Sequence, residues 1–393
     1  MLFDVTISYV GQIMMVQDIK HRFIKQLEDD SPDLKKIDLN SIVSDNLISP
    51  YKVVLPQSYL QKIKDEIKAY SVLRAWGEQH LQSDYQKLDL PKPDNYSVCM
   101  SYDFHTDDQD NLKLIEINTN AAFLSLGLTL YKLWPFAQLP NFKEKDLVDM
   151  FLNESALCKQ SSFNLAIMDE KPEDQRLYLE FLTYQSLFQK SGLKCTITDL
   201  SNIDKLPAKT LVYNRYTDFY LTNEKSKLLR ERFKNNDLFL SPNPYEYFLL
   251  ADKQRLFDWG EQTDVPKPSS LLKIYDLAKS DKDKIWLERK SLFFKPKASY
   301  GSKQAYKGAS ISRKVFDEAF ASEFVAQEYI QAKEITLGSE SEPVKLKYDL
   351  RCYVYKDRLQ MVIARLYQGQ TTNLKTVGGG FTVVEFADSV ALS

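Results

Sequence analysis

The sequence predicts a mixed α/β protein (α/β or α+β) built from more than one structural unit. The chain has 393 residues, which is longer than a single hydrophobic core usually grows. Hydrophobic residues make up 44% of it, so a sizeable interior can form. Between residues 164 and 221, short apolar strands alternate with helical periodicity, and the chain after residue 242 is rich in strands. These patterns predict helices and sheets in several subdomains.

Composition and charge exclude some classes of function. The chain carries 52 basic and 54 acidic residues, a formal charge of −2, which gives no general reason to bind nucleic acid. No run of 18 apolar residues predicts a membrane span, and the first twenty residues make a poor signal peptide. Four widely spaced cysteines fit reduced thiols. We expect a cytoplasmic protein that binds neither nucleic acid nor membranes, with a homodimer as an open alternative.

The expected elements divide the chain into four regions. Residues 1–97 are mostly helical, and one helix has an apolar stripe formed by Tyr59, Ile63, Ile67 and Tyr70. Residues 98–160 contain two strands that flank a polar turn at 106–111, followed by linking helices. We expect these two strands to pair as a hairpin.

The third region, 161–241, is expected to be a small βαβ domain. Its expected elements are strands at 165–168, 195–200 and 210–214 and a helix at 173–190. The fourth region, 242–393, begins with a helix, and its expected strands are 292–295, 324–330, 349–355 and 360–366.

The hairpin of the second region carries oxygen ligands. Side chains at positions i and i+2 of a strand share a face, so Glu116 and Asn118 point the same way, as do Asp103 and His105. If the strands pair, Asp103 comes close to Glu116 and Asn118, and the three side chains form an incomplete Mg²⁺ ligand set. A polar outer face of the hairpin is the open alternative.

A basic strand end occurs much later in the chain. Lys295 ends an apolar strand and is followed by a loop containing Ser302 and rich in Lys, Ser and Tyr. An ammonium, hydroxyls and backbone amides suit a polyphosphate. A simple hairpin loop explains the same pattern equally well.

The next strand ends in a segment that could bind a nucleoside. We expect the main chain of Gln327, Glu328, Tyr329 and Ile330 to meet an adenine, and the carboxylate of Glu334, in the loop beyond, to accept hydrogen bonds from ribose hydroxyls. An exposed strand end is the alternative.

The last strands carry two arginines. Asp349, Arg351 and Tyr353 alternate on one side of a strand, and Arg365 lies on the following one. The arginines could neutralise a transferring phosphoryl group or bind a carboxylate, or they could be surface residues. The candidate substrate-binding residues are Arg215, Asn373 and Gly379.

Together these stretches resemble the ATP-grasp superfamily, with Lys295, the segment around Gln327, the Asp349 strand and Arg365 in the order of its nucleotide-binding strands. The strands of Asp103 and Glu116 resemble its metal-binding pair but come first, as in the circularly permuted branch typified by eukaryotic glutathione synthetase. The segment Leu250-Ala-Asp-Lys253 resembles the one whose lysine reaches the nucleotide phosphates.

The resemblance implies a circularly permuted ATP-grasp fold and an ATP-dependent carboxylate-amine ligase that forms a peptide-like amide bond through an acyl phosphate. It implies ATP and Mg²⁺ as cofactors, and a small carboxylate and an amine, such as an amino acid or peptide, as substrates. Lys253 and Lys295 would neutralise the phosphates, and Arg365 and Arg351 would stabilise the oxyanion. A small-molecule kinase and a nucleotide-binding regulatory protein without turnover remain alternatives.

Overall fold

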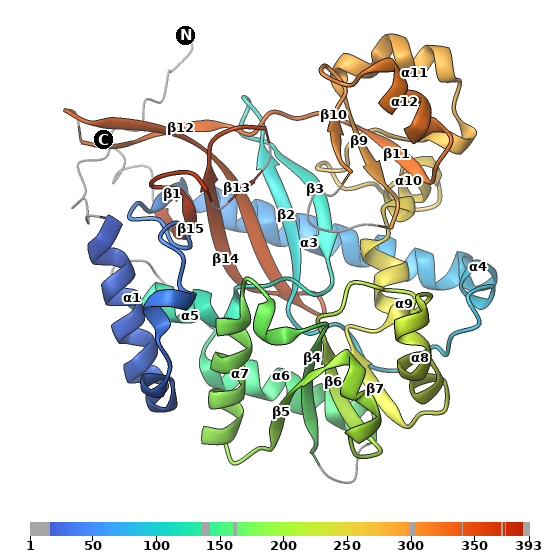
Figure 1. Cartoon of the computed structure of the whole chain (residues 1–393). Coiled ribbons are helices and arrows are strands. Elements are labelled where there is room, and N and C mark those ends of the chain that lie inside the picture. Colours follow the sequence, from blue (N-terminus) through green and yellow to red (C-terminus); the bar gives the residue numbers. More distant parts are fainter. Residues whose placement is uncertain are drawn as a thin grey trace.

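The computed structural model describes residues 16–134, 142–159, 163–298, 304–339, 341–370, 372–373 and 375–387. Within these ranges the chain forms three β-sheets, with helices packed on their faces (Figure 1). None of the helices in these ranges is both long enough and apolar enough to cross a membrane.

The central sheet brings the two ends of the chain together. Its strand order is β1-β15-β14-β13-β2-β3, and β12 pairs with the first half of β13. Only the β1–β15 pair is parallel among the described strands of this sheet. The strands are β1 (Val53–Pro56), β2 (Met100–Thr106), β3 (Leu112–Asn118), β12 (Glu334–Gly338), β13 (Pro343–Tyr355), β14 (Arg358–Tyr367) and β15 (Gly380–Ala387).

Helices cover both faces of the central sheet because its strands are apolar on both sides. On β14, Val362 and Ala364 belong to one core with helix α3, whereas Met361 and Ile363 belong to a second core with helix α5. The predicted stripe of α3 is buried in the first core. The helices of this part are α1 (Val16–Asp30), α2 (Leu39–Ile42), α3 (Gln57–His80), α4 (Gln82–Gln86) and α5 (Leu124–Lys132).

A second sheet forms an antiparallel lobe beside the free edge of β3. Its strand order is β10-β9-β11-β8, and two of its helices, α11 and α12, pack on it through a third core that contains Phe294 and Phe316. Figure 1 shows this lobe in orange, next to the β2–β3 hairpin. Its elements are α10 (Lys253–Glu261), β8 (Ile274–Asp276), α11 (Lys282–Glu288), β9 (Leu292–Pro296), β10 (Tyr306–Lys307), α12 (Arg313–Phe320) and β11 (Phe324–Glu328).

The third sheet is parallel, with the order β5-β4-β6-β7. The predicted helix at 173–190 begins later, because Gln175 has an extended backbone (φ −73°, ψ 136°) that separates a short 3₁₀ turn, Pro172–Asp174, from α7. The elements are α6 (Glu144–Leu157), β4 (Leu165–Asp169), α7 (Tyr178–Lys190), β5 (Cys195–Asp199), β6 (Thr210–Asn214), α8 (Lys227–Lys234), β7 (Leu238–Ser241) and α9 (Pro244–Glu246).

Candidate active site

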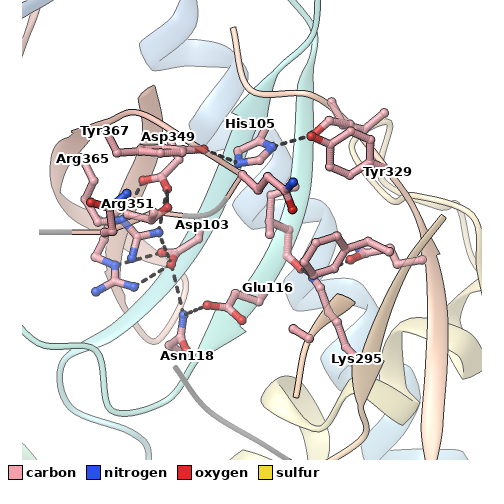
Figure 2. A pocket seen from close by; sticks show the side chains of 18 of the residues that line it. Asp103, His105, Glu116, Asn118, Lys295, Tyr329, Asp349, Arg351, Arg365 and Tyr367 are labelled. Atoms are coloured by element: carbon pink, nitrogen blue, oxygen red, sulfur yellow. Dashed lines mark hydrogen bonds and ion pairs between the residues drawn. The ribbon is translucent and has the colours of Figure 1, made fainter. Parts of the chain in front are cut away.

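A cavity of about 450 Å³ lies where the central sheet meets the antiparallel lobe (Figure 2). This volume falls within the range of small-molecule sites. Side chains of β2, β3, β13 and β14 line one side, and side chains of β9 and β11 line the other. The sequence-predicted residues that line it are Asp103, Glu116, Asn118, Lys253, Lys295, Gln327, Glu328, Tyr329, Ile330, Arg351, Arg365 and Asn373.

Strand register places the charged side chains of the central sheet. Asp103 on β2 lies opposite Glu116 on β3 and opposite Arg351 on β13. On the next pair of strands, Asp349 lies opposite Arg365. Because directly opposed residues on antiparallel strands have their side chains on the same face, all five gather at one end of the cavity.

Asp103 is the centre of a buried ionic network. Its Oδ1 accepts from Ser101 Oγ at 2.9 Å and from Arg351 Nε at 3.0 Å. Its Oδ2 accepts from Arg351 Nη2 at 2.6 Å, Arg365 Nη2 at 2.9 Å and Asn118 Nδ2 at 3.2 Å. Burial alone would raise the pKa of Asp103, but the two guanidinium groups lower it to about 2. The carboxylate is therefore held ionised between two arginines.

This network changes the role expected for Asp103. A carboxylate offers about four lone-pair positions, and the five hydrogen bonds from the protein occupy them. In this arrangement Asp103 anchors the two arginines and does not present an oxygen to a cation. The expectation that Asp103 is a metal ligand stays a prediction, and it did not include the arginines of β13 and β14.

Arg365 has a second anchor. Its Nε donates to Asp349 Oδ1 at 2.6 Å and its Nη2 to Asp349 Oδ2 at 3.0 Å. Thr372 also donates to this carboxylate from the loop after β14. Two carboxylates thus fix the guanidinium of Arg365 at the cavity wall, as Figure 2 shows.

Glu116 and Asn118 remain as oxygen donors. Asn118 Nδ2 donates to Glu116 Oε1 at 3.2 Å, so the two side chains are in contact, and both line the cavity. Within the described part of the chain, no group of three or more His, Cys, Asp or Glu residues is arranged to hold a metal ion. One carboxylate and one amide oxygen fit Mg²⁺, which often keeps several waters and takes phosphate oxygens as further ligands.

The lysine side of the cavity comes from the antiparallel lobe and α10. Lys295 Nζ donates to Gln327 Oε1 at 2.7 Å and to the carbonyl of Ile115 at 3.0 Å. Burial lowers the pKa of Lys295 to about 8, against the attraction of the Glu116 carboxylate. Burial also lowers the pKa of Lys253, the first residue of α10. Two ammonium groups therefore reach the cavity, and the carboxylate of Glu116 attracts both.

His105 joins the central sheet to the segment after β11. Its Nδ1 lies 3.0 Å from the carbonyl of Ile330, and since a carbonyl only accepts, this nitrogen carries the hydrogen. Its Nε2 lies 3.5 Å from the hydroxyl of Tyr367. The backbone N–H of Tyr329 donates to the carbonyl of Ser291. Part of the main chain expected to meet an adenine is thus already bonded within the protein.

Three predicted site residues lie away from the cavity lining. Arg215 donates to the carbonyl of Asn120 and to the hydroxyl of Tyr213, because it follows β6 of the parallel sheet. Glu334 is exposed at the start of β12, where a loop was expected. Gly379 is buried behind β14, and a Cβ there would lie 2.6 Å from the carbonyl oxygen of Leu366. Ser302 lies outside the described residues.

Several residues that line the cavity were not predicted as site residues from the sequence. Asp349 and His105 lie two positions from the predicted residues Arg351 and Asp103, so the two-residue period of a strand could have indicated them. Arg176 comes from the loop before α7, and no local pattern pointed to it.

Comparison with solved structures identifies the fold. A glutathione synthetase-like effector from Globodera pallida, solved without ligand, matches over 95% of this chain and 98% of its own, with a TM-score of 0.53 and 12% identity. The chain has an ATP-grasp-like fold of this type. No family model and no curated protein sequence matches it.

Two further ATP-grasp-like or ligase structures match less well. A putative gamma-glutamylcysteine synthetase from Methylobacillus flagellatus has a TM-score of 0.39 and 9% identity, over 79% of this chain and 84% of its own. The ATP-grasp ligase PsnB, complexed with a minimal precursor, has a TM-score of 0.28 and 10% identity, over 58% of this chain and 91% of its own.

Proposed function

We propose that the chain is an ATP-dependent carboxylate-amine ligase that joins a small carboxylate to an amine. The observation that carries this proposal is the cavity, where two lysines, two anchored arginines and a pair of oxygen donors converge. Cationic side chains of this kind suit a polyphosphate together with a substrate whose charge changes during reaction. The order of the strands, with β2 and β3 before the lobe and β13 and β14 after it, supports the circular permutation predicted from the sequence.

In this proposal the lysine side holds the nucleotide. Lys295 and Lys253 neutralise its phosphates, and Glu116 and Asn118 supply the protein oxygens for Mg²⁺. Bound ATP would supply the phosphoryl group that turns a carboxylate into an acyl phosphate, which an amine can attack. Arg365, fixed by Asp103 and Asp349 at the cavity wall, would stabilise negative charge that develops during the reaction.

Substrate recognition is proposed for two other side chains that line the cavity, Asn373 and Arg176. Their amide and guanidinium groups can bind the polar groups of a carboxylate or an amine. Arg215 would act through its contact with the carbonyl of Asn120. An amino acid or a short peptide has the required groups.

The test is product analysis with the full chain, ATP, Mg²⁺ and panels of amino acids, short peptides and polyamines. Release of ADP and phosphate that depends on both a carboxylate and an amine, with an amide product detected by mass spectrometry, supports the ligase. A stable phosphorylated acceptor would indicate a kinase. Nucleotide binding without turnover across the panels would favour a regulatory protein.

A further inference from the structure

Gln327 is a buried polar side chain whose two ends are both occupied. It is 2% exposed and lies on β11 at the cavity wall. Its Oε1 accepts from Lys295 Nζ at 2.7 Å, and its Nε2 donates to the carbonyl of Leu114 at 3.2 Å. An amide with both ends engaged inside the protein is poorly placed to recognise a base.

The arrangement follows from strand pairing in the antiparallel lobe. Gln327 lies opposite Phe293, and Lys295 lies opposite Val325, so Gln327 and Lys295 are diagonal neighbours on β11 and β9. Diagonal pairs lie within reach of long side chains on the same face of a sheet. The position of Gln327 relative to Lys295 is therefore set by the backbone.

The amide nitrogen of Gln327 links the pair formed by Gln327 and Lys295 to the central sheet. β3 is the edge strand there, so its outer backbone groups have no strand partner. The lobe satisfies them: Leu114 N–H donates to the carbonyl of Ser270 at 2.9 Å, Gln327 donates to the carbonyl of Leu114, and Lys295 donates to the carbonyl of Ile115. The same three bonds join the lobe to the strand that carries Glu116.

We propose that Gln327 is a positioning residue that holds the ammonium of Lys295 at a set distance from β3 and does not itself contact the nucleotide. An ammonium has three N–H donors, and Gln327 and the carbonyl of Ile115 use two of them, which orients the group toward the cavity. The inference rests on the proposed function, because it requires that Lys295 meets the phosphates. It assigns a role to the side chain of Gln327, whereas the sequence-based expectation concerned its main chain.

The experiment compares two ligands by calorimetry on the full chain with Mg²⁺: a nonhydrolysable ATP analogue and inorganic tripolyphosphate, which has no base. Gln327→Leu is expected to weaken both about tenfold, the effect of a lost hydrogen bond to a charged group. In a Lys295→Met background, Gln327→Leu is expected to add less than about twofold. Gln360→Leu is the matched control. Gln360 is a buried glutamine like Gln327, but it lies on β14 of the central sheet and does not line the cavity.

Other results would overturn the inference. A loss of affinity for the nucleotide but not for tripolyphosphate would mean that Gln327 contacts the nucleoside. An equal loss with and without Lys295 would mean a general structural role. Gln327→Met keeps the volume and tests the same bonds if Gln327→Leu does not fold. If the wild type binds neither ligand, or Lys295→Met leaves both affinities unchanged, the proposed phosphate role of Lys295 fails first.

Discussion

The two sides of the cavity balance their charges differently. On the arginine side, Arg351 and Arg365 bond to the carboxylates of Asp103 and Asp349, so the positive charges are paired within the protein. On the lysine side, Lys295 bonds to two neutral groups, the carbonyl of Ile115 and the amide of Gln327. The difference indicates that the arginines are already paired with carboxylates of the protein, whereas we infer that the charge of Lys295 is neutralised by a ligand.

The pKa values follow the same division. Burial opposes the charged form of any group, but the two guanidinium groups overcome it at Asp103, whose pKa is lowered to about 2. At Lys295 burial prevails over the attraction of Glu116, and the pKa falls to about 8. A polyphosphate beside Lys295 would favour its charged form, as the arginines do for Asp103.

The largest expected effect is on turnover at the arginine side. Arg365→Lys keeps the charge but loses the planar fork that binds two carboxylates. We expect turnover to fall about 10²–10³-fold and nucleotide affinity to change less than about twofold, because Arg365 is assigned to charge that develops during reaction. Steady-state kinetics and calorimetry measure the two quantities. Arg232→Lys is the control, since Arg232 also pairs with a carboxylate, Asp237, and does not line the cavity. A loss of nucleotide affinity with normal turnover would contradict the role assigned to Arg365.

The next effect is on stability. Asp103→Asn leaves two buried arginines without their shared counterion, so we expect the free energy of unfolding to fall by about 3–5 kcal/mol. Urea denaturation measures this, and Asp237→Asn, which breaks a more exposed pair, should cost about 1 kcal/mol or less. Wild-type stability together with weaker Mg²⁺ binding would return Asp103 to the role of a metal ligand.

Glu116 lies on β3 of the central sheet, and its carboxylate attracts Lys253 and Lys295, so Glu116→Gln tests a group that acts on both sides of the cavity. Within the described part of the chain, the side chain of Glu116 accepts one hydrogen bond, from Asn118, so the loss of its charge should leave the unfolding free energy within about 1 kcal/mol of the wild type. We expect the Mg²⁺ concentration needed for half-maximal activity to rise about tenfold, because a ligand charge is lost. A large loss of stability without a change in Mg²⁺ dependence would mean that Glu116 is structural.

The smallest effect is a pH dependence of nucleotide binding. Lys295 is charged below its pKa of about 8 and neutral above it, so affinity should fall as pH rises. Between pH 7 and pH 8.5 the charged fraction drops about fourfold, and the affinity for a nonhydrolysable ATP analogue should follow. Calorimetry at both pH values measures this, with Lys295→Met as the variant in which the dependence should vanish. An affinity that rises with pH would contradict the assignment.

Much of the fold could be predicted from local patterns. Short apolar runs mark β4, β6 and β9 closely, and the period of two places Glu116 and Asn118 on one face. The adjacency of β2 and β13 could not come from such patterns, because Asp103 and Arg351 are 248 residues apart. Only the family resemblance brought the early hairpin and the late strands together.

The roles of single residues were harder to predict than their location. Asp103 was expected to bind a metal because its strand partner Glu116 was considered without Arg351 and Arg365, whose register on neighbouring strands decides its bonds. The main chain of Gln327 was expected to meet a nucleotide, but the contact of its side chain with Lys295 could not be predicted because it depends on the pairing of β9 and β11. Sequence patterns indicate on which face of a strand a side chain lies, but they do not indicate which other side chain it contacts there.

A crystal structure of the full chain with Mg²⁺ and a nonhydrolysable ATP analogue tests the central claim most directly. We predict that the phosphates lie beside Lys295 and Lys253, that Glu116 and Asn118 bind the cation, and that Asp103 is still bonded to both arginines. A nucleotide bound outside this cavity, or Asp103 released from the arginines and bound to the cation, would contradict it.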